Sequence, residues 1–245
     1  MADARGPAAG DLEAALEQPR RAGRPRLRPA SNAGVPPREE ILDAAAGLFV
    51  SQGLAATTTR QIAERVGIRQ ASLYYYFTGK DEILLELLTQ SVRPSLRVAA
   101  TLESRSRDDP AAALYALALI DVRTLTEAPH NIATLYLMPE VQGEEFTSFR
   151  AERDQLQAAY GRLGRAAAPS SGLDETLIAT LVMQVVESVI QLRRAGDLRD
   201  AYAQEIAASC LRLIGLGALE VTSARAAAAE LLTAARPPGG EPPAQ

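Results

Sequence analysis

The sequence TTTRQIAERVGIRQASLYYYFTGK, residues 57–80, predicts two short helices joined by a tight turn. Thr58 can cap the first helix, and Gln61 stands three residues later, which is the spacing of a capping box. Gly67 can adopt the left-handed conformation that ends a helix, and a second helix is then expected over residues 69–75. This order of helix, turn and helix is the helix-turn-helix pattern, whose second helix enters the major groove of DNA.

The second helix carries side chains that can read bases. Gln70 can bond adenine and Arg69 guanine through paired hydrogen bonds, and Tyr75 can reach a base edge or a thymine methyl group. Tyr74 can reach a phosphate, whereas Tyr76 is expected to pack, since three consecutive tyrosines cannot share one face. The residues expected to contact DNA are Thr58, Arg60, Arg69, Gln70, Ser72, Tyr74, Tyr75 and Lys80, with Arg24 and Arg26 from a preceding arm.

Two flanking helices complete the expected head. The segment 38–52 places apolar residues at helical spacing, and Thr78 and Asp81 have capping-box spacing at the start of the next helix. The free N–H groups of that first turn, together with Lys80, can hold a phosphate; a solvated lysine is the alternative. The helix 38–52 and the two helices of the helix-turn-helix are expected to enclose a core of Leu42, Phe49, Ile62, Val66, Ile68, Leu73 and Phe77.

The order of residues resembles that of the TetR/AcrR family of transcriptional regulators. The resemblance covers residues 38–88 and is carried by the helix 38–52 with Gly53 and by Thr58, Ile62-Ala63, Val66-Gly67-Ile68, Leu73-Tyr74-Tyr75-Tyr76-Phe77 and Lys80-Asp81-Glu82-Ile83-Leu84. It implies an all-α fold, with an N-terminal three-helix helix-turn-helix DNA-binding domain and a C-terminal helical ligand-binding and dimerisation domain. The family usually has Ser or Thr at the position of Arg69, so the resemblance does not say which side chain caps the second helix.

Charge is divided unevenly along the chain. The net charge is −4, but residues 20–84 carry ten basic and six acidic groups, which leaves +4 there and −8 elsewhere. A basic N-terminal part suits contact with phosphates. In the arm RRAGRPRLRP, residues 20–29, Arg24 and Arg26 resemble arginines that enter a minor groove; a disordered basic tail is the alternative.

The remaining chain predicts further helices over residues 81–104, 110–126, 131–137, 144–164, 174–195, 200–216 and 218–235. Pro94 should kink or break the first of them. The helix 174–195 is apolar on two sides, which calls for partners on both. The resemblance makes the helices 174–195 and 200–216 half of a four-helix bundle in a homodimer; the alternative is a helix fully buried within a monomer.

The C-terminal part is expected to bind a small, largely apolar effector in a cavity. Thr124, Gln184 and Glu187 are the better candidates, because burying a polar group without a partner costs free energy. The expected lining is Leu117, Ile120, Thr124, Tyr136, Phe146, Phe149, Met183, Gln184 and Glu187, with His130, Met138 and Arg150 as further candidates.

Catalytic and metal chemistry is not expected. His130 and Cys210 are the only residues of their types, which argues against a metal site and a serine-histidine-aspartate triad. We therefore expect no enzyme, no catalytic residue and no cofactor. The sequence also lacks an apolar run of membrane-spanning length and a signal peptide, so a cytoplasmic protein is expected.

These patterns predict an arm over residues 1–35, a DNA-binding domain over 36–82, a ligand-binding and dimerisation domain over 83–235 and a tail over 236–245. The expected function is a ligand-responsive regulator that binds double-stranded DNA at a palindromic operator as a homodimer. By resemblance it is a repressor, with an activator left open. The alternative is a ligand-independent dimeric regulator whose C-terminal domain only dimerises.

Overall fold

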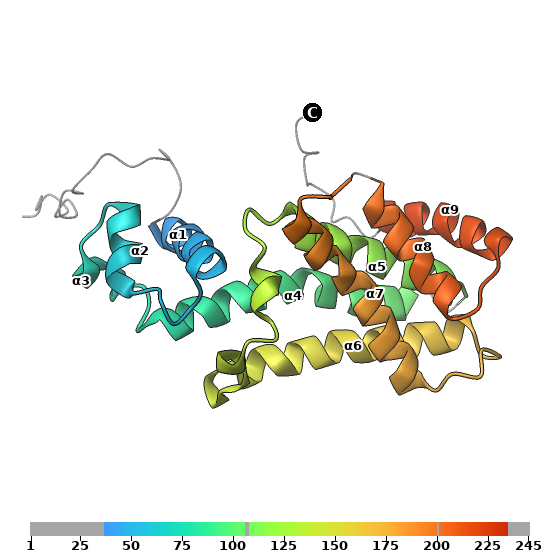
Figure 1. The fold of residues 1–245 in the computed structure, drawn as a ribbon. Helices are drawn as coiled ribbons and strands as arrows, with labels where there is room; N and C mark the ends of the chain where they lie inside the picture. Colours follow the sequence, from blue (N-terminus) through green and yellow to red (C-terminus); the bar gives the residue numbers. More distant parts are fainter. Residues whose placement is uncertain (1–36, 106–107, 200, 235–245) are drawn as a thin grey trace, which may run out of the picture.

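The computed structural model describes residues 37–105, 108–199 and 201–234 (Figure 1). The expected arm, with Arg24 and Arg26, and the expected tail lie outside these described residues. Regular structure in the described part is helical, which confirms the all-α class. The helices are α1 (Pro37–Gln52), α2 (Thr59–Val66), α3 (Gln70–Leu73), α4 (Lys80–Arg105), α5 (Pro110–Glu127), α6 (Thr147–Ala167), α7 (Glu175–Ala195), α8 (Tyr202–Leu213) and α9 (Ala218–Ala234), with short 3-10 helices at Ile132–Leu135, Pro139–Gln142 and Glu144–Phe146.

The head consists of α1, α2, α3 and the start of α4, at the left of Figure 1. Its core is close to the expected one: Phe49, Ile62, Leu73 and Phe77 are 0–1% exposed. Val66 and Ile68 pack against the same core but stay partly exposed. The head is small, so each of these side chains makes up a large part of its core.

Helix α4 runs without a break from the head into the body (Figure 1). The expectation that Pro94 could break the helix is wrong, because Pro94 lies inside an uninterrupted α4. The expected partner of Thr78 is also wrong: Glu82, rather than Asp81, accepts from the Thr78 N–H at 2.6 Å and from its hydroxyl at 2.8 Å. These two hydrogen bonds lower the pKa of Glu82.

The body is built around α5, whose residues 112–119 are all buried. This helix contacts α4, α6, α7, α8 and α9. Helices α6 and α7 approach closely because α6 carries glycines: a Cβ at Gly164 would lie 2.3 Å from Cγ2 of Ile178. The pair α6 and α7 therefore depends on the missing side chain at that position.

The segment between α5 and α6 differs from expectation. A helix over 131–137 was expected, and the structure forms only a 3-10 turn there, Ile132–Leu135. The helix expected from residue 144 begins at Thr147, after the 3-10 turn Glu144–Phe146. Because Pro139 lacks an N–H group, it cannot continue a helix from residues 131–137 and instead starts the 3-10 turn Pro139–Gln142.

Helix α7 lies on the front of the body in Figure 1 and is only partly covered by its own chain. In the described part of the chain it is the one helix that is long and apolar enough to cross a membrane by length and composition alone, which is weak evidence for a membrane span. Of its most apolar 18-residue window, 39% is buried, and Leu177 is 42% exposed. Part of the apolar surface of α7 is thus open in the single chain.

Candidate DNA interface and ligand site

The turn between α2 and α3 is held by the residues that the sequence indicated. The Gln61 N–H donates to Oγ1 of Thr58 at 3.2 Å, and the Thr58 N–H donates to Oε1 of Gln61 at 2.8 Å. Both halves of the expected capping box are therefore present. Gly67 has φ of 77°, and its N–H bonds the last turn of α2, which is the left-handed ending that glycine allows.

Helix α3 presents polar and aromatic side chains to solvent. Tyr75 is 85% and Tyr74 50% exposed, and Arg69, Gln70 and Ser72 are exposed as well. Tyr75 makes an edge contact with Tyr76 but leaves most of its ring in solvent, and neighbouring exposed aromatic side chains often mark an interaction site. The expected packing role of Tyr76 agrees with the structure, because Tyr76 is half-buried against the core. Arg69 caps α3 without a side-chain hydrogen bond.

Thr59 orients two side chains of this surface, although no pattern in the sequence indicated it. The Gln70 amide donates from Nε2 to Oγ1 of Thr59 at 2.9 Å, and that oxygen lies 3.2 Å from the Tyr74 hydroxyl. Gln70 and Tyr74 are thereby oriented before any DNA arrives. Thr59 stands on α2, eleven residues before Gln70, so no spacing rule within one helix connects them. Only the packing of α2 against α3 brings the two side chains together.

Three other residues expected at DNA already have partners within the head. Thr58 is used by the capping box. Arg60 is exposed and donates from Nε to Glu64 at 2.8 Å, an interaction that raises the pKa of Arg60. Lys80 donates from Nζ to the carbonyl of Leu54 at 2.9 Å and of Thr57 at 3.4 Å. Because an ammonium has three protons, Lys80 can bind the α1–α2 loop and still offer one proton to a phosphate.

The residues expected to line a ligand cavity are mostly core. Leu117, Phe146 and Phe149 are at most 1% exposed, and Tyr136 and Met183 at most 7%. Ile120 and Thr124 are half-buried, while Gln184 is exposed on α7 and is not brought to the others. Thr124 donates to the carbonyl of Ile120 at 3.0 Å. Glu187 accepts from Arg153 at 2.6 Å, so both polar groups are already satisfied.

A buried polar cluster that the sequence analysis did not identify joins α4, α5 and α6. Asp121 is 4% exposed; it accepts from Ser95 at 2.7 Å and from Tyr160 at 2.8 Å. Burial raises the pKa of Asp121 to about 6 and is only partly opposed by these two hydrogen bonds. Beside it, the Ser91 and Tyr136 hydroxyls lie 2.7 Å apart. No sequence motif marks Asp121, which directly follows an apolar run in α5.

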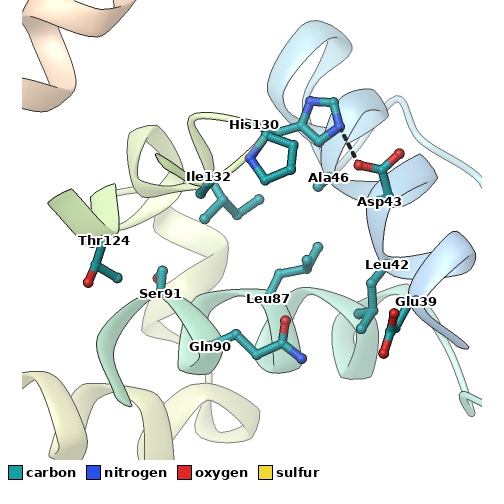
Figure 2. Close-up of a pocket in the computed structure, with 12 residues that line it drawn as sticks. Glu39, Leu42, Asp43, Ala46, Leu87, Gln90, Ser91, Thr124, His130 and Ile132 are labelled. Carbon is teal, nitrogen blue, oxygen red and sulfur yellow. Dashed lines mark hydrogen bonds and ion pairs between the residues drawn. The ribbon is translucent and has the colours of Figure 1, made fainter. Parts of the chain in front are cut away.

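A cavity of about 380 Å³ lies at the junction of head and body (Figure 2). Of the residues expected to line a ligand cavity, Thr124 and His130 line this one. Across it, Nε2 of His130 lies 3.1 Å from Oδ1 of Asp43 on α1. The complete lining is Glu39, Leu42, Asp43, Ala46, Leu87, Gln90, Ser91, Thr124, Ala128, Pro129, His130 and Ile132.

Within the described ranges, no three His, Cys, Asp or Glu side chains gather where they could hold a metal ion. Cys210 is buried with a free thiol, and burial raises its pKa to about 12. A thiol that stays protonated near neutral pH is a poor nucleophile.

Comparisons with known proteins give a family for the head and related solved structures for the whole fold. Residues 41–87 match a family model described as bacterial regulatory proteins, tetR family. The crystal structure of Mycobacterium smegmatis AmtR is 37% identical, covers 86% of this chain and 100% of its own, and has a TM-score of 0.77. The repressor KstR2 of Mycobacterium tuberculosis is 49% identical over 51 residues, 21% of this chain and 26% of its own. AcrR of Shigella flexneri is 24% identical over 67% of this chain and 74% of its own. The match thus spans about a quarter of the KstR2 chain.

Proposed function

The chain belongs to the TetR/AcrR family of transcriptional regulators, and on that premise we propose that it is a homodimeric repressor released from a palindromic operator by a small molecule. Family membership makes it a DNA-binding regulator of transcription. The operator symmetry, the sign of regulation, the ligand control and the residues involved are the proposed part. KstR2, which the head resembles, is named as a repressor.

The surface of α3 is the observation that carries the DNA-binding part. Gln70 and Tyr74 are oriented by Thr59, and Tyr75 projects from the turn that follows α3. An oriented amide suits paired hydrogen bonds to adenine, and an exposed tyrosine ring suits contact with a thymine methyl group. Ordering these side chains in advance reduces the entropy lost on binding. Direct base reading is therefore assigned to Gln70 and Tyr75.

Dimerisation is assigned to α7 and α8, the helices expected at 174–195 and 200–216. The stripe of Leu177, Leu181 and Leu192 on α7 has helical spacing; Leu177 is exposed and the other two are half-buried, and a second copy would cover it. Two heads related by a two-fold axis read two half-sites about one DNA turn apart. This symmetry is the reason for proposing a palindromic operator.

Ligand control rests on the continuity of head and body through α4 and on the cavity at their junction. The close packing of Leu117, Phe146 and Phe149 in the body favours the second candidate, a dimeric regulator without an effector. The two candidates share the DNA-binding head and differ only in whether a small molecule changes operator affinity.

A mobility-shift assay with DNA from upstream of the coding sequence tests the proposal. We expect a specific shift that a compound in a small-molecule panel releases. Gln70→Ala should change the preferred base at one position of each half-site by about 1–3 kcal/mol, measured by selection from random DNA. The matched control Gln155→Ala replaces an exposed glutamine on α6 and should change nothing.

The alternatives give different results. A shift that no compound releases favours the ligand-independent regulator. If Gln70→Ala weakens all sequences equally, base reading by Gln70 is wrong. If neither upstream DNA nor selected DNA binds at moderate salt, the proposed function fails.

A further inference from the structure

The cavity at the junction of head and body has walls from both parts of the molecule. Leu42, Asp43 and Ala46 come from α1 in the head, while Thr124, residues 128–130 and Ile132 belong to the body. Figure 2 shows the carboxylates of Glu39 and Asp43 on the α1 side and Thr124 at the opposite end. A volume of about 380 Å³ lies within the range of small-molecule sites. An occupant would touch head and body at once.

The body wall of this cavity is attached to α7. Arg193 of α7 donates to the carbonyls of Leu125 at 2.7 Å and His130 at 3.5 Å, and also to that of Ala128. The Asn131 amide donates to the carbonyl of Ile190 at 2.9 Å. We call residues 128–131 the strap. Because these hydrogen bonds fix the strap to α7, the strap moves with the body.

Fewer hydrogen bonds join the strap to α1 in the head than join it to α7. His130 bonds Asp43 at 3.1 Å, and a Cβ at Gly47 would lie 3.1 Å from its Cε1, so the imidazole packs closely over α1. A single hydrogen bond between partly exposed side chains contributes only modestly to stability. An occupant between strap and α1 can therefore compete with this contact and favour a different head position.

The chemistry of the lining selects the occupant. Leu42, Ala46, Leu87, Pro129 and Ile132 provide an apolar surface. Charged lining groups are the carboxylates of Glu39 and Asp43, and neither arginine nor lysine lines the cavity.

The neutral polar groups of the lining are largely engaged. Ser91 bonds the carbonyl of Leu88 and the hydroxyl of Tyr136, Thr124 bonds its own helix and the Gln90 amide donates to Glu86. Asp43 bonds His130 through Oδ1, which leaves its Oδ2 and the exposed carboxylate of Glu39 as acceptors for an occupant. An anionic occupant would meet like charge, whereas an ammonium group would be attracted.

We propose that this junction cavity binds a small apolar amine, and that the bound amine lowers operator affinity by repositioning the head against the strap. The inference rests on the proposed ligand-controlled function and names the site and the ligand class. The apolar part of the amine lies against Leu42, Leu87 and Ile132, and its ammonium group lies at Glu39 and Asp43. A ligand changes the balance of two head positions only by binding them unequally, and this site contacts both moving parts.

A fluorescence titration tests the site directly. The chain contains no tryptophan, so the emission of a naphthyl probe can be followed in the full-length protein. The probe is 2-(1-naphthyl)ethylamine, with 2-(1-naphthyl)ethanol and 1-naphthylacetate as neutral and anionic analogues. We expect the amine to bind at one site per protomer, about tenfold more tightly than the alcohol, the ratio that one charge-assisted hydrogen bond supplies. The acetate should bind more weakly still.

Three variants locate the probe. Asp43→Asn and Glu39→Gln should each weaken amine binding about three- to tenfold and leave alcohol binding unchanged. Glu145→Gln, at an exposed carboxylate between α5 and α6, is the matched control and should have no effect. Ala128→Phe fills the cavity from the strap and should abolish binding of amine and alcohol. Its circular dichroism spectrum and melting temperature report whether it is folded.

The outcomes separate the site from the function. Equal binding of the three probes, an amine Kd weaker than about 1 mM, or unchanged binding in folded Ala128→Phe would overturn the site. If Ala128→Phe does not fold, the two carboxylate variants decide. Amine binding that leaves operator affinity unchanged would overturn the effector role. The titration contains no DNA, so failure of operator binding would count against the proposed function and not against the cavity.

Discussion

Asp121 illustrates how one residue can make the stability of this protein depend on pH. Its carboxylate is buried between Ser95 of α4 and Tyr160 of α6. Glu187, Arg153 and Cys210 also act on this cluster electrostatically. The pKa of Asp121 is raised from 3.8 to about 6, mainly by burial. The folded protein therefore holds this proton more tightly than the unfolded chain.

The sign of the effect follows from that difference. Between pH 3.8 and about 6 the folded state binds more protons at Asp121, so its contribution to the free energy of unfolding falls as pH rises. The contribution is full below pH 3.8 and lost above about pH 6, with a total of about 3 kcal/mol. We expect Asp121→Asn to remove this dependence, because an amide of equal size can still bond both hydroxyls.

Urea unfolding at pH 4.5 and 7.5 measures this. Relative to the wild type, Asp121→Asn should gain stability between the two pH values, while Asp154→Asn, at an exposed aspartate on α6, should follow the wild type. A variant that parallels the wild type at both pH values would show that Asp121 does not titrate in this range.

At the scale of elements, the contact between α7 and the end of α5 depends on one side chain. A helix leaves its last carbonyls without partners within the helix. Arg193 supplies donors to Leu125 and to the strap carbonyls of Ala128 and His130. Burial lowers the pKa of Arg193, and its guanidinium stays charged because an arginine pKa lies far above neutral pH. Arg193 thus joins the expected dimerisation helix to the strap.

We expect Arg193→Met to lower the free energy of unfolding by about 1–3 kcal/mol, because the carbonyls lose their donors while the aliphatic length is kept. Arg194→Met is the matched control, since Arg194 is the next residue and is exposed. Thermal and urea unfolding of both variants provide the measurement. Equal stability of the two variants would mean that the strap carbonyls find other partners.

At the scale of the whole molecule, α7 carries an apolar stripe, Leu177, Leu181 and Leu192, that one chain covers only in part. Only 39% of its most apolar window is buried. Leu177 on this helix is 42% exposed, so a charge at this position costs little within one protomer. In a dimer formed through α7 and α8, the same charge would be buried without a partner, which is strongly unfavourable.

We therefore expect Leu177→Glu to weaken dimerisation at least about tenfold, which corresponds to 1.4 kcal/mol, as measured by sedimentation equilibrium. Affinity for a full palindrome should fall while half-site affinity is kept. Leu219→Glu on α9, at a leucine that is 88% exposed, is the control. If only the control dissociates the dimer, the interface involves α9 instead of the α7 stripe.

Local sequence determined the parts of this protein that depend on neighbouring residues. Thr58, Gln61 and Gly67 set the ends of α2 because caps and left-handed turns form between residues at most five positions apart. The apolar spacing of α1 and α7 likewise predicted their buried faces. The helix-turn-helix and the all-α class follow from such short-range rules.

Tertiary structure decided which distant residues meet. Thr59 orients Gln70, Glu82 rather than Asp81 bonds Thr78, and the apolar residues expected around a ligand form packed core instead. Pro94 stays inside α4, where packing against α5 and α6 can compensate for its missing hydrogen bond. The Asp121 cluster and the junction cavity join helices tens of residues apart, and their existence depends on the volumes and angles of packed helices, which no local pattern of residues contains.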